Sequence, residues 1–249
     1  LASPPGFRPL HCEAAVEAGK HVFVEQPLGV DVPGVRRVLR AGAAAREKSL
    51  SMAAGLRHRY DAAYLETVAQ LRQAVIGTPL VLRVYRNTGQ IRPQQRQGNQ
   101  TDLEYQLRNG PLFTWLSGDQ IADHHVQELD VCIWLLQATP LSANAHGGCR
   151  DPLCVEEGGN PATPAFDQFF CEFVYPGETR VFSQCRHASG SWNVVAAHLH
   201  ATQGRADISG GKIYDLDGER IWRSQARRGG PQQQQEDLIG AIRAGRVLN

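Results

Sequence analysis

A short stretch of this sequence places side chains that transfer protons beside side chains that only hydrogen-bond. Asp123 carries a carboxylate and Gln127 an amide, and their spacing puts both on one face of a helix. Asp130 lies about one turn further along, whereas His124 and His125 are rotated off that face. A carboxylate or a neutral imidazole can accept a proton, but a glutamine amide cannot do so at neutral pH. We therefore expect acid–base chemistry at Asp123 or His125, with Gln127 as a hydrogen-bonding residue.

A structural role is the alternative for the same side chains. Asp123 and Asp130 would then only orient their neighbours, and the two histidines would pack in the interior or cap the helix. We favour the chemical role for Asp123 and the packing role for His124. The sequence leaves both alternatives open.

A pair of histidines, His198 and His200, forms a second pattern with chemical potential. They are two residues apart in a segment expected to be a strand, so both imidazoles face the same side. Three nitrogen or oxygen ligands with one open position make a hydrolytic zinc site. Further ligands could come from elsewhere in the chain, namely His187, His124, His125 and Asp123. Because a histidine pair on a strand is a weak signal, we favour a polar sheet face and expect no metal.

The predicted order of helices and strands, which positions these residues, changes near residue 58. Apolar periodicity and β-branched runs predict helices at 10–19, 35–46, 60–75, 121–136 and 236–244. Strands are expected at 21–25, 50–55, 80–86, 169–174, 179–186, 192–201 and 206–215. We expect an α/β plus α+β protein with two domains: residues 1–58, the tail of a doubly wound domain, and residues 59–249, built on a large, mostly antiparallel open sheet.

Two polar segments are predicted to lack regular structure. Residues 87–109 are rich in Gln, Arg, Asn and Gly and predict a long loop, and residues 231–235 predict a linker. Arg92 and Arg96 lie in the loop without interleaved aromatic residues, so a solvated loop or an arm around a partner subunit is favoured over RNA contact.

The overall composition excludes several classes of partner. The chain has 249 residues, of which 42% are apolar and 20% charged, and its formal net charge is only +1. Such a chain has no long-range field to attract nucleic acid or an anionic membrane. No apolar run approaches the roughly 18 residues that a membrane span needs. We therefore expect neither nucleic acid nor membrane as a partner.

The chain begins at Leu1 and its single methionine is Met52, so we expect an N-terminally truncated piece of a longer protein. No targeting segment is visible. The cytoplasm is favoured as the compartment, and export stays open. The six cysteines form no CxxC pair and are interpreted as small buried side chains, although a Cys171–Cys185 cross-strand disulfide is the alternative in an oxidising compartment.

Several motifs in order resemble one enzyme family. Ser3-Pro4-Pro5, His11, the run from Gly19 to Val22, and Glu25-Gln26-Pro27 resemble the middle of the glucose–fructose oxidoreductase, inositol dehydrogenase and MocA (Gfo/Idh/MocA) family. Gly55 to Asp61 resembles the segment with which that family leaves its dinucleotide domain. The match continues in two further segments. One is the helix with Asp123, Gln127, Asp130 and Trp134, and the other is the C-terminal segment 237–249.

The resemblance implies a Rossmann-type nucleotide domain, a sheet domain that forms homo-oligomers through its other face, and NAD or NADP as cofactor. It also implies hydride transfer on a sugar, cyclitol or related polyol. The family's lysine of Glu-Lys-Pro is Gln26 here, and its helix histidine is Gln127. Gln26 would then bind a substrate hydroxyl or the nicotinamide amide, and the acid–base role would pass to Asp123 or His125.

The resemblance also implies where the cofactor and substrate lie. Residues near ribose and nicotinamide would be Ser3, Pro4, Pro5, His11, Glu25 and Gln26. The glycine-rich fingerprint for the pyrophosphate would precede Leu1, and the Gly-Gly pairs at 147–148, 158–159 and 229–230 do not replace it. Substrate contacts would come from Arg59, Tyr60, Trp115, Asp123 and Gln127. Arg59 could equally be a solvated arginine, and Trp115 a core residue.

Three functions follow as hypotheses. The first is an NAD(P)-dependent oxidoreductase acting on a small sugar-like substrate. The second is a catalytically decayed relative that binds a ligand or a partner, which the glutamines at 26 and 127 would explain. The third is a metal-dependent hydrolase using His187, His198 and His200.

Overall fold

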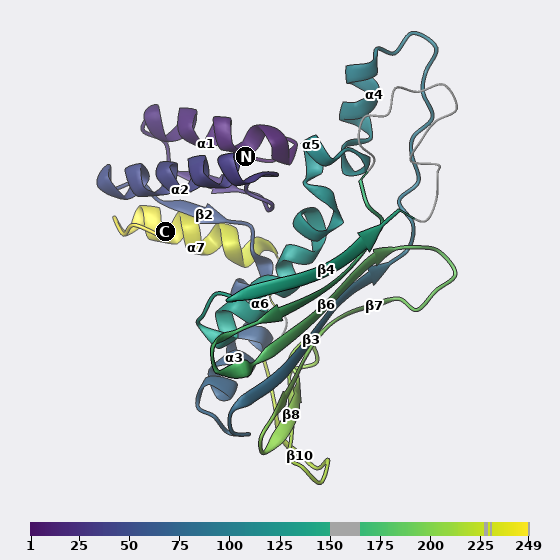
Figure 1. Cartoon of the computed structure of the whole chain (residues 1–249). Coiled ribbons are helices and arrows are strands. Elements are labelled where there is room, and N and C mark those ends of the chain that lie inside the picture. The colour runs from purple at the N-terminus through teal and green to yellow at the C-terminus, as the bar shows by residue number, and fades with distance from the viewer. Residues whose placement is uncertain (150–164, 227–228, 230, 249) are drawn as a thin grey trace.

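The computed structural model describes residues 1–149, 165–226, 229 and 231–248 (Figure 1). Its N-terminal unit consists of η1 (Pro5–Phe7), α1 (Arg8–Glu17), β1 (Val22–Val24), α2 (Val32–Glu47) and β2 (Met52–Ala54). β1 and β2 pair in parallel, as the predicted αβ order requires. Both helices begin earlier than predicted because a proline occupies the first turn of each. The side chain of Asp31 also caps α2 by accepting a hydrogen bond from the Gly34 amide at 2.7 Å.

The C-terminus returns to this N-terminal unit. α7 (Pro231–Arg243) lies beside α2 and β2 in Figure 1. The Met52 amide donates to the Leu248 carbonyl at 2.9 Å, and the Leu248 amide donates to Ser51 Oγ at 3.1 Å. The predicted linker at 231–235 is wrong, because these residues form the first turns of α7. Side-chain hydrogen bonds at helical spacing, such as Gln232 to Glu236 at 2.7 Å, stabilise that end.

The larger unit is an eight-stranded sheet with the order β10-β9-β8-β7-β3-β6-β5-β4. Its strands are β3 (Pro79–Thr88), β4 (Ser142–Gly148), β5 (Gln168–Val174), β6 (Arg180–His187), β7 (Val194–Ala201), β8 (Gly204–Asp207), β9 (Lys212–Tyr214) and β10 (Arg220–Arg223). β3 and β6 are parallel, and the other pairs are antiparallel. The prediction of a large, mostly antiparallel sheet is confirmed.

The strands at the two edges of this sheet were the hardest to predict. β4 has no alternation of buried and exposed residues, since nearly all of it is exposed, and β10 is also largely exposed. An edge strand without a buried face carries no period-two signal. The predicted strand 206–215 is two strands, β8 and β9, joined by a turn at Gly210 and Gly211.

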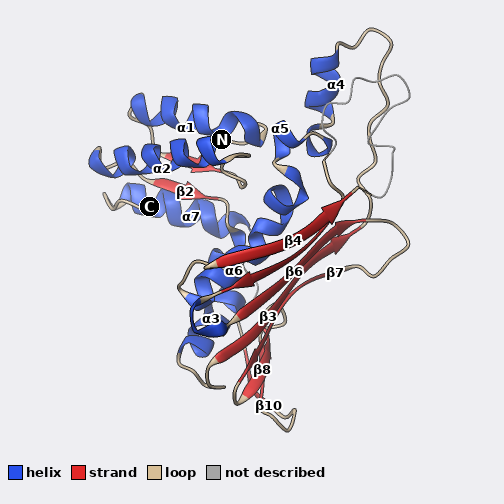
Figure 2. Cartoon of the chain, viewed as in Figure 1, coloured by secondary structure: helices blue, strands red, loops and turns tan. Residues whose placement is uncertain are grey.

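Helices cover one face of the sheet. η2 (Arg57–Tyr60) leads into α3 (Ala62–Arg72), and η4 (Ile121–His125), which is π-helical, continues directly into α6 (Val126–Leu136). Figure 2 shows α3 and α6 against the sheet. Their apolar side chains, including Val68 and Val131, join Leu82, Val84 and Leu199 of the central strands in the main core. This packing places η4 at the end of the sheet that faces the N-terminal unit.

The segment predicted as a long loop contains a helix. α4 (Asp102–Arg108) begins with a capping box, in which Thr101 Oγ accepts from the Glu104 amide and Glu104 accepts from the Thr101 amide. This Thr-x-x-Glu signal was present in the sequence but lay within a polar stretch that otherwise predicts a loop. Short helices η3 (Gly110–Leu112) and α5 (Thr114–Ser117) follow, and η6 (Pro176–Glu178) joins β5 to β6.

Cys171 and Cys185 are buried free thiols, so the alternative of a disulfide between them is wrong. In the β5–β6 register Cys171 lies opposite Ser183 and Cys185 opposite Phe169. Cys154 and the glycine pair at 158–159 lie outside the described residues. No helix among the described residues is long and apolar enough to span a bilayer.

Candidate functional site

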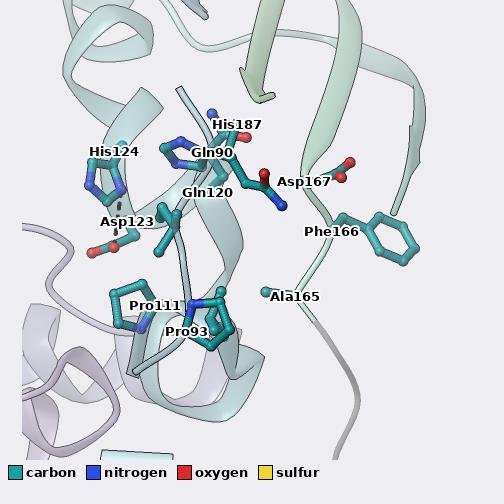
Figure 3. A pocket seen from close by; sticks show the side chains of 12 residues that line it. Gln90, Pro93, Pro111, Gln120, Asp123, His124, Ala165, Phe166, Asp167 and His187 are labelled. Carbon is teal, nitrogen blue, oxygen red and sulfur yellow. Dashed lines mark ion pairs between the residues drawn. The ribbon is translucent and has the colours of Figure 1, made fainter. Parts of the chain in front are cut away.

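Three cavities meet around Asp123 and His124. The sheet-end cavity, about 50 Å³, is drawn in Figure 3 and is lined by both residues together with Gln90, Ile91, Pro93, Pro111, Leu112, Gln120, Ala165, Phe166, Asp167 and His187. The glutamine cavity, about 240 Å³, is lined by Glu25, Gln26, Gly55, Arg57, Arg86, His124, Gln127 and Gln234. The N-terminal cavity, about 220 Å³, is lined by residues 2–5, Arg8, Asp123 and residues of α4 to α5. Asp123 and His124 therefore stand where the two units of the chain meet.

Asp123 and Gln127, predicted to share one helix face, line different cavities, and the turn at Ile121–His125 that carries Asp123 is π-helical. A π turn closes hydrogen bonds to the fifth residue instead of the fourth, so it holds more residues than an α turn. Asp123 lines the sheet-end and N-terminal cavities, and His124 lines the sheet-end cavity and, together with Gln127, the glutamine cavity. Such turns inside helices are frequent at functional sites.

Asp123 and His124 form a carboxylate–imidazole pair. His124 Nδ1 lies 3.0 Å from Asp123 Oδ2, although this nitrogen has no well-aligned hydrogen bond among the described residues. His187 packs edge-on against His124 with ring centroids 5.3 Å apart (Figure 3). Burial lowers the pKa of His187, and the neighbouring His124 adds to this, so His187 favours the neutral form.

The glutamine cavity is named for three side chains that line it, each with a buried carbonyl oxygen that has no hydrogen-bond partner. Gln127 Nε2 donates to the Gly55 carbonyl at 3.0 Å, which directs its Oε1 away from that bond. Oε1 of Gln26 and of Gln234 are also buried and unsatisfied. An unpaired buried acceptor costs free energy, so this cavity suits a ligand that brings several hydrogen-bond donors.

A buried ionic cluster of Glu128, Arg86, His58 and His125 lies next to the glutamine cavity. Glu128 is 1% exposed, and Arg86 forms two hydrogen bonds with it, at 2.9 and 3.2 Å. His58 and His125 approach the same carboxylate at 3.4 and 3.6 Å. Burial alone would raise the pKa of Glu128, but the two histidines and Arg86 together hold it far below its ordinary range. This cluster fixes the guanidinium of Arg86 at the wall of the glutamine cavity.

His125 belongs to that buried cluster. It is fully buried, and its Nε2 lies 2.7 Å from Ser183 Oγ on β6. An imidazole enclosed between the helix and the sheet has no path to a substrate. The geometry therefore favours the Asp123 pair over His125 for the predicted acid–base role.

The residues predicted near the cofactor divide between two cavities. Ser3, Pro4 and Pro5 line the N-terminal cavity, while Glu25 and Gln26 line the glutamine cavity. His11 is exposed, and its Nδ1 lies 2.9 Å from Ser3 Oγ.

Arg8 joins these two groups and was missed from the sequence. Its guanidinium donates to the carbonyls of Ser3, Glu25 and Pro27 at 2.8 to 3.0 Å. Burial lowers its pKa, and Asp123 and Glu25 oppose that shift. No sequence signal separates it from other arginines at a helix start, because its partners are backbone carbonyls distant in the chain.

Three residues predicted to contact the substrate, Arg59, Tyr60 and Trp115, lie outside η4, and the structure shows contacts of a structural kind for Arg59 and Trp115. Arg59 forms two hydrogen bonds with Asp130, at 2.7 and 2.8 Å, so Asp130 has the orienting role that was the alternative for it. Trp115 is 40% exposed, donates from Nε1 to Gln106 at 2.8 Å and contacts Phe7 edge-on. Tyr60 is half-buried, which raises its pKa. Their substrate contacts stay predictions.

The histidines of the metal hypothesis are not brought together. His200 Nε2 lies 2.9 Å from a guanidinium nitrogen of Arg83, and His198 lies 3.8 Å from Asp207. His187 is bonded to Thr88 at the end of β6. Within the described ranges, no group of three or more His, Cys, Asp or Glu side chains has the arrangement of a metal site.

Comparison with known proteins gives a consistent family signal. No family model matches the chain. It is 31% identical over 124 residues to inositol 2-dehydrogenase/D-chiro-inositol 3-dehydrogenase from Shouchella clausii, covering 49% of this chain and 29% of that protein. It is 32% identical over 152 residues to inositol 2-dehydrogenase from Pseudomonas fluorescens, covering 57% and 38%. The chain thus spans about a third of the length of the curated relatives it matches.

The fold matches solved structures over nearly the whole chain. Aldose-aldose oxidoreductase from Caulobacter crescentus, solved with glycerol, superposes with a TM-score of 0.75 at 19% identity. The match covers 98% of this chain and 68% of that one. The similarity supports the fold described above, with its αβ unit and its large open sheet.

Proposed function

We propose, from the premise that this chain belongs to the Gfo/Idh/MocA family, that the protein containing it is a nicotinamide-dependent oxidoreductase acting on a sugar, cyclitol or related polyol. The glutamine cavity carries this proposal. Gln26, Gln127 and Gln234 line it, and among the described residues each has a buried carbonyl oxygen without a hydrogen-bond partner. Each can accept a hydrogen bond from one hydroxyl group, and a polyol presents several hydroxyls at neighbouring carbons.

The residues present fit the nicotinamide half of such a cofactor. Gln26 Oε1 is a buried acceptor without a partner, suited to the donor end of a carboxamide. Ser3, Pro4, Pro5 and Glu25, in cavities that Arg8 ties together, would hold the ribose side, with His11 beside Ser3. When bound, the cofactor supplies the acceptor or donor of hydride. The choice between NAD and NADP is left to experiment.

The chain's own residues orient the alcohol and handle its proton. Gln127 accepts a hydrogen bond from a hydroxyl group that does not react, Gln26 does so if it does not bind the carboxamide, and Arg86 offers a charged donor at the cavity wall. The Asp123 carboxylate stands at the junction of the cavities and belongs to the proton-transfer apparatus. Fixed polar groups of this kind lower the barrier because they need no reorganisation during the reaction.

Calorimetry with NAD, NADP and myo-inositol tests the proposal, using this chain and a longer protein with the upstream coding sequence added. Dinucleotide binding by the longer protein, with reduction of the nicotinamide when a polyol is added, is the expected result. The absence of binding in both proteins would remove the nicotinamide hypothesis.

A tight polyol complex without turnover would instead favour a catalytically decayed binding protein. The variant Gln26→Lys with Gln127→His then separates the cases. A gain of turnover indicates a decayed enzyme, and no gain indicates a binding protein.

Homo-oligomerisation through the open face of the sheet is part of the same proposal. Trp192 and Phe170 are exposed there, at 64% and 39%. Exposed apolar groups of this size on a sheet suit a protein interface. Light scattering on the purified protein should give a multiple of the chain mass, and Trp192→Glu should lower it.

A further inference from the structure

We infer that His124 is the side chain that accepts the alcohol proton, with Asp123 as its positioning residue. This inference rests on the proposed function and deepens it. The resemblance assigns proton transfer to positions that are Gln26 and Gln127 in this chain, and neither amide can take a proton. His124, on the π-helical turn, lines the same cavity as these two glutamines.

Access is the first argument. The side chain of His124 is 38% exposed, against 0% for His125 and 19% for Asp123. His124 lines the glutamine cavity together with Gln26 and Gln127, whereas Asp123 lines the two cavities beside it. A ligand held by the glutamine carbonyls therefore meets the imidazole before it meets the carboxylate.

The chemistry of the cavity wall is the second argument. Its ionisable side chains are Glu25, Arg57, Arg86 and His124. Among these types only imidazole changes charge near neutral pH, and an arginine is always protonated. A carboxylate of ordinary acidity is a weaker proton acceptor than an imidazole at that pH.

Orientation is the third argument. His124 Nδ1 lies 3.0 Å from Asp123 Oδ2, which leaves Nε2 for a substrate hydroxyl. A carboxylate at one imidazole nitrogen fixes the tautomer and stabilises the imidazolium once the proton has arrived. The neutral His187, edge-on to the ring, limits its rotation without adding charge. The loose Nδ1 alignment is usual before substrate binds.

The step balances in atoms and electrons. The alcohol O–H bond breaks and its proton goes to His124 Nε2. The C–H bond breaks with its electron pair, which leaves as hydride for an oxidised nicotinamide, and the carbon–oxygen double bond forms from the former O–H pair. The imidazolium then releases its proton to solvent. The reverse reduction uses the same groups in the opposite order.

The test measures turnover in the protein that contains this chain with its nucleotide domain. We expect His124→Gln to lower kcat with myo-inositol about 100-fold or more, the usual size of an acid–base contribution, and to leave KM within a few-fold. His124→Ala should recover part of its activity when imidazole is added. The control His146→Gln lies on the exposed strand β4 and should leave kcat unchanged. A kcat for His124→Gln within two-fold of wild type would overturn the inference.

A binding readout keeps this inference separate from the proposed function. In ¹⁵N-histidine NMR, one imidazole signal should shift when myo-inositol is added, and His124→Gln should remove that signal. Asp123→Asn should change its tautomer pattern. If the wild type turns over no polyol, the proposed function fails, and an unmoved His124 signal then overturns the inference as well. If Asp123→Asn loses as much activity as His124→Gln and imidazole rescues neither His124→Ala nor Asp123→Asn, Asp123 is itself the base.

Discussion

The continuous segment formed by η4 and α6 carries two polar clusters that differ in burial and in hydrogen bonding. In the buried cluster, both oxygens of Glu128 have partners among Arg86, His58 and His125. In the cavity cluster, the carbonyl of Gln127 and the Nδ1 of His124 lack well-formed hydrogen bonds. Hydrogen bonds to both oxygens of Glu128 hold the helix in place, although His125 Nδ1 of the same cluster has no hydrogen-bond partner among the described residues. Unpaired groups beside a cavity are available to a ligand.

Removing the charge of the buried cluster should have the largest effect on stability. Glu128→Gln leaves Arg86 without its counter-ion in the interior, and breaking a buried pair this way costs about 3–5 kcal/mol. Urea unfolding followed by circular dichroism measures the loss. The matched control is Glu172→Gln, which breaks an ion pair with the more exposed Arg180 and should cost under about 1 kcal/mol. Equal losses for the two variants would contradict the large stabilisation assigned to the buried Glu128 carboxylate.

The cavity cluster should respond in binding more than in stability. Gln127→Met keeps the side-chain size but removes the carbonyl acceptor, so affinity for myo-inositol should fall about ten-fold, the equivalent of one hydrogen bond. Calorimetry measures the affinity, and urea unfolding should show a loss of no more than about 1 kcal/mol from the bond to Gly55. Gln184→Met, on the open face of the sheet, is the control that should bind as the wild type does.

Neutralising Asp119 should have a smaller effect on stability than Glu128→Gln, and it should raise stability at pH 7. Burial raises its pKa to about 6, and its φ of 68° is a conformation that asparagine also accepts. The folded state therefore holds a proton between about pH 4 and 6 that the unfolded state has lost, so stability falls as pH rises through this window. After allowance for partial solvent screening, Asp119→Asn should add about 1 kcal/mol at pH 7. The gain should vanish near pH 3.5 in unfolding experiments, and a gain that persists there would show that burial of the charge is not its cause.

His187 should give the smallest effect. Burial lowers its pKa, so the unfolded state binds the extra proton first, and stability decreases as pH falls through the ordinary histidine range. His187→Gln should flatten the stability profile between pH 7 and pH 5. His146→Gln should leave the profile unchanged, and an unchanged profile in His187→Gln would argue against the neutral state assigned to His187.

Local patterns anticipated much of the fold. The Ala-rich helix ending at Gly19, the β-branched strand after it and the strong helix before Leu136 are each determined by residues close in sequence. β4 and β10 were missed because edge strands without a buried face leave no periodic pattern. α4 was missed although Thr101 and Glu104 signalled its start, because its composition resembles that of a loop.

The sequence predicted the segment that contains the candidate site. It did not predict which of its side chains line a cavity and which are buried in the interior. Asp123 and Gln127, grouped by their spacing, line different cavities, and the turn that carries Asp123 is π-helical. His124 and His125 are neighbours in sequence with the same side chain, yet one lines a cavity and the other is fully buried against Ser183. Nothing in their local sequence separates the two, because their environments are formed largely by segments distant in the chain, such as Gln26 beside His124 and Ser183 beside His125.

The sequence by itself determined most of the order of helices and strands, the family resemblance and the presence of glutamine, which cannot accept a proton, at positions 26 and 127. These properties depend on residue type and short-range spacing. Only the tertiary structure decided that Glu128 is buried with Arg86, that three glutamine carbonyls meet in one cavity, and that His124 faces them. Burial and pairing are set by segments that approach each other after folding, so the same side chain can be a support or a reactive group depending on what packs against it.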